Sequence, residues 1–349
     1  MVLIRRHSNG YNFVGDTNSG ITFRWGESFK DDPLRAPFPE LVDISISNHC
    51  SKGCYFCYRE SASNQSFMSL ADYEFIIKSL IDPKWGNVFQ VALGGGEPLE
   101  HPKFIEILEI TKRHMIVPNF TTNGIHLTKA IVSQIKPLIG TLAISFSDIR
   151  NISSSKVFHL LNEGIKPNIH FILNKNSIKQ GIEILEGIHN SLLKDFNSII
   201  FLTYKPAGRA TNDLCLSLTN DLHRFCKLIN DNNCILNIGF DSCFVPILMH
   251  LTNTNIDYID PCECAFFSAY IDENLNVKPC SFANNNRDTY NLKDIKFSEI
   301  WNDYWISYRN AQKNTCLREC KNAINCRGGC PYYDQINLCK SVKSVQSLV

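Results

Sequence analysis

The chain has 349 residues, 44% of them hydrophobic, and a formal net charge of +1. This length allows about two domains. The near-neutral charge provides no strong attraction to nucleic acid or to a membrane surface, so we expect neither as a partner. The N-terminus lacks the apolar core of a secretory signal, and no stretch approaches 18 uninterrupted apolar residues. We therefore expect a cytoplasmic protein without a membrane span.

Residues 1–40 are a polar front segment that resembles a β-hairpin. Three strand-like stretches are separated by turns at Asn9-Gly10 and Ser19-Gly20, and they are Val2–Arg6, Tyr11–Val14 and Ile21–Trp25. Two interpretations follow. An exposed strand edge would accept an extended peptide through backbone hydrogen bonds. Alternatively, the hairpin only covers one end of the domain that follows it.

Residues 41–240 alternate strand-like and helix-like segments. The expected strands are Leu41–Ser47, Val88–Leu93, Val117–Thr122, Leu142–Phe146, Ile169–Leu173 and Ile199–Tyr204. The expected helices are a segment beginning after Ser69, then Lys103–His114, Lys129–Leu138, Lys156–Asn162, Ile182–Leu193 and Leu222–Asn230. This alternation predicts an α/β fold with parallel strands and outer helices, and six units predict a partial (β/α)6 TIM-like barrel. Functional residues are then expected at the carboxyl ends of the strands.

Residues 241–349 differ in composition, because cysteines become frequent and helical periodicity fades. Fifteen cysteines in a chain without a secretory signal favour metal ligation over disulfides. We expect a small cysteine-rich domain that is held together by metal rather than by a large core. Cys215, Cys226 and Cys234 lie before this region, and we expect them to be buried apolar residues of helices or strands.

A separate group of three cysteines lies earlier in the chain, directly after the first expected strand of the barrel. Cys50, Cys54 and Cys57 have the spacing Cys-x3-Cys-x2-Cys, and Phe56 precedes the third. Three thiolates can hold three irons of a [4Fe–4S] cluster and leave the fourth iron open to a ligand that is not protein. The alternative is a structural zinc knuckle with His49 as the fourth ligand. Ligation by the adjacent residues His49 and Cys50 is awkward in a tetrahedral site.

This spacing resembles the signature of the radical S-adenosylmethionine (radical SAM) enzymes. Gly94-Gly95-Gly96-Glu97-Pro98 ends the second strand, as the glycine–glutamate motif of that family does. A phosphate-binding loop is the alternative, but no Gly-Lys-Ser/Thr follows. The resemblance implies that SAM chelates the open iron and that Glu97 holds its amino group. The cofactor-binding residues that it implies are Phe56, Gly95, Gly96, Glu97, Pro98, Asn123, Ser145 and Arg209. Ser147 stands where family members often carry aspartate.

The C-terminal cysteines resemble the SPASM domain of peptide-modifying radical SAM enzymes. That resemblance implies two auxiliary [4Fe–4S] clusters, one held by Cys262, Cys264, Cys280 and Cys330 and the other by Cys316, Cys320, Cys326 and Cys339. Cys243 is an alternative to Cys262. Leu275 stands where a glycine is usual, and Cys316 and Cys320 are one residue further apart than usual. A pair of zinc ribbons is the remaining alternative for the eight thiolates.

The resemblance implies an enzyme that cleaves SAM reductively to a 5′-deoxyadenosyl radical, which abstracts hydrogen from a peptide or protein. Crosslinking, thioether formation, epimerisation and side-chain oxidation are such modifications. A flavodoxin-type or ferredoxin-type protein is the expected electron donor. Two other functions stay open. One is a radical SAM dehydrogenase that acts on a small molecule, and the other is a non-enzymatic iron–sulfur or zinc protein.

Overall fold

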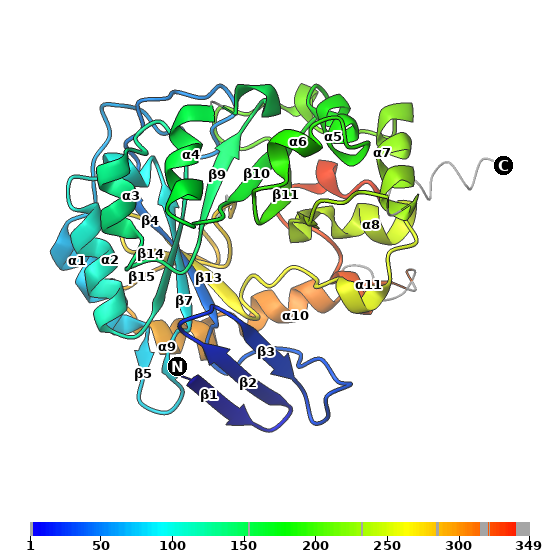
Figure 1. The fold of residues 1–349 in the computed structure, drawn as a ribbon. Coiled ribbons are helices and arrows are strands. Elements are labelled where there is room, and N and C mark those ends of the chain that lie inside the picture. Colours follow the sequence, from blue (N-terminus) through cyan, green and yellow to red (C-terminus); the bar gives the residue numbers. More distant parts are fainter. Residues whose placement is uncertain are drawn as a thin grey trace. The chain divides into compact units, whose positions relative to one another are not determined.

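The computed structural model describes residues 3–152, 154–231, 233–283, 286–314, 320 and 322–339, so the predicted ligand Cys316 lies outside the described residues. The chain forms two compact units. The first comprises Met1–Gly53, Ser61–Leu142 and Glu263–Arg309. The second comprises Cys54–Glu60, Ala143–Cys262 and Asn310–Val349. Figure 1 shows the order of the elements along the chain.

The central sheet of the first unit has the strand order β8-β7-β4-β13-β14-β15. Its strands are β4 (Leu41–Ser47), β7 (Gln90–Gly95), β8 (Val117–Thr122), β13 (Ser268–Ile271), β14 (Asn276–Lys278) and β15 (Tyr290–Asn291). β4 is parallel to β7 and to β13, so a strand from the cysteine-rich C-terminal region extends this sheet. The short pair β5 (Ile81–Asp82) and β6 (Gly86–Asn87) is separate.

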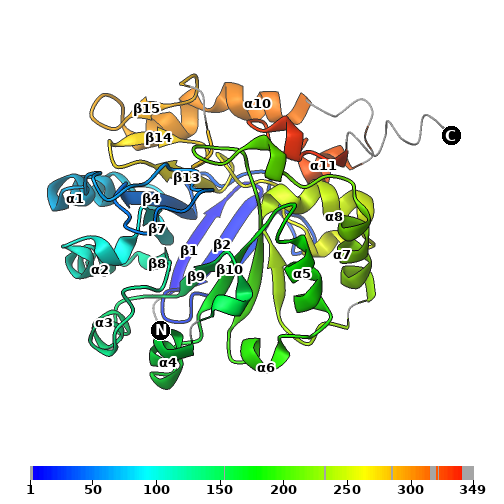
Figure 2. The ribbon, with the colours of Figure 1, turned by 90° about the horizontal axis from the view of Figure 1, so that it is seen from above.

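The helices of the first unit follow from capping and periodicity. α1 (Leu70–Ser79) begins where Ser69 Oγ accepts a hydrogen bond from the backbone N–H of Asp72, at 3.0 Å, as its sequence predicts. α2 (Phe104–Arg113) and α3 (Lys129–Ile135) follow, and all three lie along one side of β4, β7 and β8 (Figure 2). The remaining helical segments are η1 (Pro98–Glu100), α9 (Phe297–Glu299), η6 (Ile300–Tyr304) and α10 (Ile306–Asn314). The first unit ends at Arg309, so the last residues of α10 belong to the second unit.

The front segment forms an antiparallel sheet with the strands β1 (Leu3–Ser8), β2 (Tyr11–Asp16) and β3 (Thr22–Trp25), as predicted. One face of β2 is buried, because Tyr11 and Phe13 pack with Phe89, Val117, Phe266 and Phe267. The Arg6 side chain donates hydrogen bonds to the carbonyls of Phe38 and Pro39, both at 2.9 Å. The inner face of this sheet therefore covers part of the core of the first unit.

Deletion of residues 1–25 is expected to yield insoluble protein. It removes the buried rings of Tyr11 and Phe13, and truncating even one buried aromatic ring costs about 3–5 kcal/mol. Two such losses approach the whole stability of a typical domain, about 5–15 kcal/mol. The soluble fraction after expression and far-UV circular dichroism measure the effect. A folded deletion variant would mean that the segment is an independent extension.

The second unit contains parallel strands in the order β12-β11-β10-β9. They are β9 (Leu142–Phe146), β10 (Asn168–Leu173), β11 (Ser198–Thr203) and β12 (Ile238–Phe240). The helices are α4 (Ser154–Asn162), α5 (Ile178–Leu185), α6 (Asn190–Leu193), α7 (Asn220–Asp231), α8 (Val245–Leu251) and α11 (Ala323–Cys326). Single turns of 3-10 helix are η2 (Ile149–Asn151), η3 (Asn212–Leu214), η4 (Ser242–Phe244), η5 (Ile256–Tyr258) and η7 (Asp334–Ile336). Figure 2 shows α5, α6 and α7 outside β10 and β11.

All six predicted barrel strands are confirmed to within two residues at either end. The predicted helix over Ile182–Leu193 is instead two helices, because Gly187 adopts a φ of 82° between α5 and α6. Cys226 is buried in α7, as expected. The same prediction is wrong for Cys215 and Cys234, which are only half-buried and lie outside helices and strands.

Leu275, which stands in place of a glycine, keeps the backbone geometry that a glycine provides. Its φ is 66°, and its side chain is buried. Asp272 stabilises this turn, because Asp272 Oδ1 accepts hydrogen bonds from the N–H groups of Asn274 and Asn276, both at 3.0 Å. Burial of the leucine side chain offsets the cost of a left-handed conformation, about 1–2 kcal/mol.

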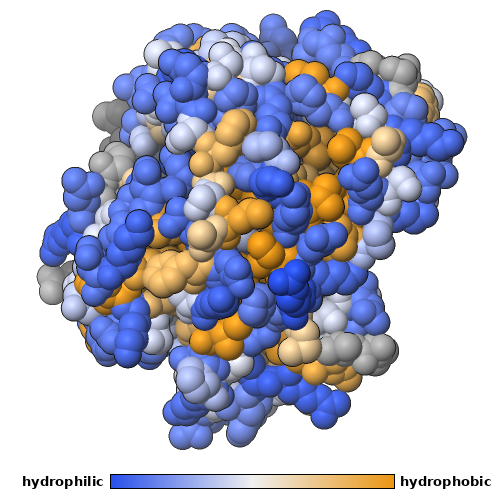
Figure 3. Space-filling model, turned by 90° about the vertical axis from the view of Figure 1, so that its left-hand side faces the viewer, coloured by the Kyte–Doolittle hydropathy of each residue, from blue (hydrophilic) through white to orange (hydrophobic). Residues whose placement is uncertain are grey.

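Hydrophilic residues cover most of the face that is drawn in Figure 3, and apolar residues gather toward its middle. Within the described ranges, every helix is too short or too polar to cross a membrane.

Candidate functional site

The carboxyl ends of β4 and β7 bring the beginning of the cysteine loop, with Cys50, and the glycine-rich turn together in the first unit. The ladder between these strands shifts register at Ser45 and Ser47, where β7 ends with Gly95. A Cβ on Gly95 would overlap Ser45 Oγ and the Ser47 carbonyl oxygen, and a Cβ on Gly96 would overlap the His49 carbonyl oxygen. A Cβ on Gly94 meets no protein atom within 4 Å. Two of the three glycines thus permit close backbone packing, and Gly94 opens onto free space.

Glu97 is buried, with 2% of its surface exposed, and its carboxylate accepts three hydrogen bonds. Thr122 Oγ1 donates to Glu97 Oε1 at 2.6 Å, and the Leu99 N–H donates to the same oxygen at 3.2 Å. The Asn123 N–H donates to Oε2 at 2.7 Å. Burial raises the pKa of Glu97 above its usual value, although these three donors oppose the shift. A carboxylate has about four acceptor positions, so one stays available for a ligand cation.

Asn123 adds an unpaired donor next to this carboxylate. Its side-chain oxygen accepts a hydrogen bond from the Ile125 N–H at 2.9 Å. Its Nδ2 group is buried without a hydrogen-bond partner among the described residues. A buried donor without a partner costs about 1–3 kcal/mol. A bound ligand with a carboxylate or hydroxyl acceptor would remove this cost, so Glu97 and Asn123 together fit an amino acid such as the methionine part of SAM.

The beginning of the cysteine loop is fixed by Glu100, which sequence reasoning did not identify. His49 Nε2 lies 3.2 Å from Glu100 Oε2, and the Ser51 N–H donates to the same oxygen at 3.0 Å. His126 Nε2 lies 2.9 Å from Oε1. Burial raises the pKa of the Cys50 thiol, and the backbone N–H groups of residues 52 and 53 oppose this shift. Backbone donors around a sulfur suit a thiolate that binds iron.

In the second unit, Arg209 binds the backbone of the other two cysteines. Arg209 Nε donates to the Cys54 carbonyl at 3.0 Å, and the Arg209 N–H donates to the Cys57 carbonyl at 3.1 Å. A Cβ on Gly208 would lie 2.6 Å from the Cys57 carbonyl oxygen, so only glycine fits there. The Cys57 N–H also donates to the Cys54 carbonyl at 3.2 Å. The turn after β11 therefore positions this half of the loop.

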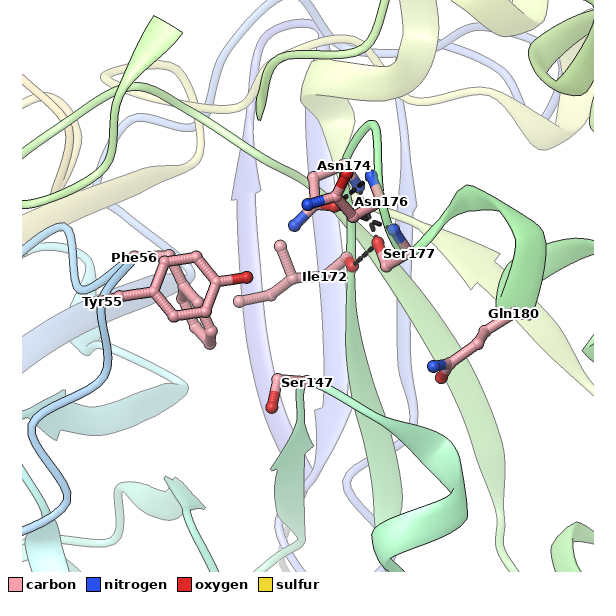
Figure 4. A pocket seen from close by; sticks show the side chains of 8 residues that line it. All are labelled: Tyr55, Phe56, Ser147, Ile172, Asn174, Asn176, Ser177 and Gln180. Atoms are coloured by element: carbon pink, nitrogen blue, oxygen red, sulfur yellow. Dashed lines mark hydrogen bonds between the residues drawn. The ribbon is translucent and has the colours of Figure 1, made fainter. Parts of the chain in front are cut away.

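A pocket of roughly 390 Å³, partly open to solvent, lies in the second unit (Figure 4). Tyr55 and Phe56 lie on one side of it, and the turn after β10 lies on the other, with Ile172 between them. Asn174 Oδ1 accepts hydrogen bonds from the N–H groups of residues 176 and 177, which fixes this turn. The lining residues are Tyr55, Phe56, Ser147, Ile172, Asn174, Asn176, Ser177 and Gln180. An aromatic ring with amide and hydroxyl groups around it is suited to a nucleoside.

Other predicted cofactor residues lie at strand ends. Pro98 begins η1 directly after Glu97, and Ser145 lies in β9, opposite His170 of β10. The pocket is lined by Ser147 rather than Ser145. Sequence reasoning missed Thr122, Asn174 and Gln180. Thr122 ends β8 and Asn174 directly follows β10, where polar residues of ordinary turns also occur, and Gln180 lies in α5.

The predicted auxiliary ligands are distributed over both units. Cys264 and Cys280 belong to the first unit, and the Phe282 N–H donates to Cys280 Sγ at 3.4 Å. The second unit contains Cys262, Cys320, Cys326, Cys330 and Cys339. Within the described ranges, no three His, Cys, Asp or Glu side chains are arranged to share one metal ion. In a cubane cluster each thiolate binds a different iron atom. The cysteines of a [4Fe–4S] site therefore lie further apart than ligands that share a single metal ion.

Residues 44–204 match the Radical SAM superfamily. They form a radical SAM domain. The matched range holds Cys50, Cys54, Cys57 and Glu97, and it begins in β4, directly before the cysteine loop. The family prediction made from the cysteine spacing is thus confirmed.

Similar proteins extend beyond this domain. The mycofactocin maturase MftC of Mycobacterium tuberculosis is 22% identical over 322 residues, which cover 84% of this chain and 78% of that protein. The structure of Streptococcus suis SuiB bound to S-adenosylmethionine superposes with a TM-score of 0.69 at 19% sequence identity. The match covers 97% of this chain and 95% of the SuiB chain. The enzyme anSMEcpe with bound AdoMet and Cp18Cys peptide has a TM-score of 0.61 at 18% identity and covers 88% and 96%. These structures share the fold, which confirms the predicted fold class of a partial (β/α)6 barrel.

Glu97→Gln is expected to weaken SAM binding by about one to two orders of magnitude, because a charge-assisted hydrogen bond contributes roughly 1.5–3 kcal/mol. Binding of an ammonium group requires the ionised carboxylate. Since burial raises the pKa of Glu97, acidification through that pKa protonates it and weakens SAM binding. The glutamine variant lacks this pH dependence. Isothermal titration at several pH values measures both effects.

Glu106→Gln is the matched control, because Glu106 lies on α2 in an exposed ion pair with Lys103, at 2.9 Å. It should bind SAM as the wild type does. Wild-type affinity in Glu97→Gln at every pH would exclude the proposed role of Glu97.

Proposed function

We propose that this protein is a radical SAM enzyme that modifies a peptide or small protein. The radical SAM domain, with its Cys-x3-Cys-x2-Cys loop at the end of β4, carries this proposal. The peptide substrate is supported by two similarities. SuiB in its complex with the precursor peptide SuiA has a TM-score of 0.68 and covers 97% of this chain. The maturase MftC is similar along 84% of it.

Each predicted site residue would have a separate role in the reaction. When bound, the [4Fe–4S] cluster of the cysteine loop and SAM supply a radical that removes hydrogen from the substrate. Cys50, Cys54 and Cys57 would bind three irons of that cluster. Glu97 would accept a hydrogen bond from the amino group of SAM, and Asn123 Nδ2 would donate one to the carboxylate of SAM. Phe56 and the pocket after β10 would hold the adenosine part. Glu100 and Arg209 would position the cysteine loop through hydrogen bonds with its backbone.

We also propose that Cys320 belongs to one of two auxiliary [4Fe–4S] clusters that serve the substrate step. Three cubanes correspond to about twelve irons per chain in anaerobically purified protein. Cys320→Ala should lower this count by about four and abolish the peptide product. Formation of 5′-deoxyadenosine should continue, because Cys50, Cys54 and Cys57 are intact.

Iron analysis and product analysis by mass spectrometry measure these effects, and circular dichroism checks the fold, since loss of metal can unfold a small domain. A folded, iron-depleted Cys320→Ala variant that still modifies its peptide at the normal rate would contradict the division of labour.

Coexpression with a short peptide encoded next to the gene tests the function itself. Mass spectrometry should reveal a mass change in the peptide that depends on Glu97 and on the three cysteines of the loop. SAM cleavage by the reduced protein without any peptide modification would favour a small-molecule substrate. A reconstituted protein that does not cleave SAM at all would favour a non-enzymatic iron–sulfur or zinc protein. A flavodoxin-type or ferredoxin-type protein is the proposed electron donor.

We further propose that the outer face of the β1–β3 sheet contacts the peptide. Phe23 in β3 is 66% exposed, and it pairs with Val14 across the strands. Because this side chain lies away from the core, Phe23→Ser leaves the fold intact where deletion of the segment would not. Peptide affinity should fall in the variant, while SAM cleavage without peptide stays normal. Equal peptide affinity would leave the sheet with a covering role alone.

A further inference from the structure

Arg309, on α10 of the first unit, is a buried cation whose charge has no anionic partner among the described residues. Only 5% of its surface is exposed. Its Nε group donates to the Ala265 carbonyl at 2.5 Å, whereas Nη1 and Nη2 are buried without any hydrogen-bond partner in the described part of the chain. Burial lowers the pKa of Arg309 to about 9, and the positive charge of Arg35 adds to the shift, so the guanidinium stays protonated at neutral pH. Its remaining N–H donors and its charge are therefore available to an anion.

The groups that surround this guanidinium do not replace an anion. Arg309 Cζ lies 4.9 Å from the centroid of the buried Trp301 ring. Such a cation–π contact offsets only part of the cost of burying a charge. Glu263 lies two residues before Ala265, but its carboxylate is already 3.0 Å from Arg24 Nη1. An uncompensated buried charge is strongly destabilising, so we expect the working protein to hold a negatively charged group here.

Two of the predicted cluster ligands lie at the same end of β13 as this cation. Cys264 directly precedes Ala265 and forms a backbone bridge with Ser268, the first residue of β13. The Ala265 N–H donates to the Ser268 carbonyl at 2.8 Å. Cys280 follows β14, which is antiparallel to β13, so the chain reaches this cysteine at the amino end of β13. All of these residues belong to the first unit, and Arg309 is attached to the residue next to one of the two cysteines.

The donors around these cysteines fit an iron–sulfur cluster. The Phe282 N–H donates to Cys280 Sγ at 3.4 Å, and Arg309 adds unused N–H groups beside Cys264. A [4Fe–4S] cluster with four thiolate ligands has a net negative charge, and each reduction adds one electron without a proton. Hydrogen bonds to its sulfurs and nearby charges set its reduction potential. An orphaned, buried guanidinium supplies both.

We propose that Arg309 donates hydrogen bonds to the auxiliary [4Fe–4S] cluster that Cys264 and Cys280 bind, and that its charge raises the reduction potential of that cluster. This inference rests on the auxiliary clusters of the proposed function and adds a residue that the sequence resemblance does not include. Because reduction adds negative charge, a neighbouring cation stabilises the reduced cluster more than the oxidised cluster. Arg309 thus determines how readily this cluster accepts an electron.

The first test measures reduction potentials in the Cys50/Cys54/Cys57→Ala chain, where every signal comes from auxiliary clusters. Reconstituted protein is titrated with dithionite and followed by electron paramagnetic resonance. Arg309→Met keeps a long side chain without the charge. At the midpoint potential of its parent, the ratio of reduced to oxidised cluster should be about tenfold lower, which is a shift of about 59 mV for one electron. Only one of the two auxiliary clusters should respond.

Two further variants separate the buried charge from general effects. Arg309→Lys keeps a positive charge and should lower the potential less than Arg309→Met does. Arg35→Met removes an exposed charge of the same unit, which solvent screens, so it should keep the parent potential. The proposal would be overturned by an Arg309→Met chain in which both auxiliary clusters keep the parent potential, or by an equal shift in Arg35→Met.

The second test observes the arginine side chain itself, and it decides the question even if Arg309→Met does not fold. The same background chain is produced with isotope-labelled guanidinium nitrogens, reconstituted and reduced. Electron spin echo envelope modulation should detect an arginine nitrogen coupled to one auxiliary cluster, and Arg309→Lys should remove this coupling. Arg327→Lys is the matched control and should retain it, because Arg327 Nη1 donates to the Cys262 carbonyl at 2.8 Å. Reduced clusters without any arginine coupling, or a coupling that persists in Arg309→Lys, would contradict the proposal.

Neither test uses the peptide reaction. If both give the expected result and no peptide is modified, the proposed function fails and the role of Arg309 stands. If the peptide is modified while the potentials and the nitrogen coupling do not depend on Arg309, only this inference fails. A wild-type protein with only about four irons would exclude the auxiliary clusters and this inference with them.

Discussion

The Cys50/Cys54/Cys57→Ala variant is expected to form no 5′-deoxyadenosine and to contain about four irons fewer than the wild type, the content of one cubane. The reason is the number of ligands. Each thiolate binds one iron, and alanine offers no donor, so the loop of the variant retains no protein ligand for the cluster. Iron analysis and quantification of 5′-deoxyadenosine by liquid chromatography measure both effects.

The chain offers a matched control, because Cys215, Cys226 and Cys234 lie outside every predicted ligand set. Alanine at these three positions should leave both iron and SAM cleavage unchanged. Far-UV circular dichroism confirms that both triple variants are folded. Two results would reject the cluster assignment: a wild-type protein that contains mainly zinc and lacks charge-transfer absorption, or residual 5′-deoxyadenosine formation in the Cys50/Cys54/Cys57→Ala variant.

Gly96→Ala is expected to destabilise the first unit and to abolish SAM binding. The Gly96 N–H donates to the Ser47 carbonyl at 2.7 Å, and the Glu97 N–H donates to the His49 carbonyl at 2.8 Å. A Cβ on Gly96 would overlap the oxygen of that His49 carbonyl, so the backbone before Cys50 must move. Overpacking costs about 1–3 kcal/mol, and the two weakened hydrogen bonds add about 0.5–1.5 kcal/mol each. The thermal midpoint should fall by on the order of 5 °C.

Gly94→Ala is the control for this substitution, because it adds the same methyl group two residues earlier, where no protein atom lies within 4 Å. It should unfold at the wild-type temperature. Thermal unfolding followed by circular dichroism compares the two variants, and isothermal titration with SAM measures binding in each. A Gly96→Ala protein with the wild-type midpoint and full SAM affinity would mean that the close packing of Gly96 against His49 is dispensable.

The sequence by itself determined the local elements and the order of the motifs. Alternating apolar runs of five to seven residues are long enough to specify β4, β8 and β9, and a serine cap specifies the start of α1. The cysteine loop and the glycine-rich turn are each defined by residues that lie close together in the sequence. Their positions at strand ends could therefore be predicted, and with them the radical SAM domain.

Only the tertiary structure decided which distant residues support those motifs. Glu100 reaches back to Ser51, and Arg209 binds the Cys54 carbonyl 155 positions earlier. No periodicity or spacing encodes such contacts, because they arise where loops from different strands meet after packing. The sequence likewise left open whether the front segment covers a core, and the burial of Tyr11 and Phe13 on one face of β2 answered that. Local patterns specify elements and motifs, whereas the partners of each side chain depend on how the elements pack.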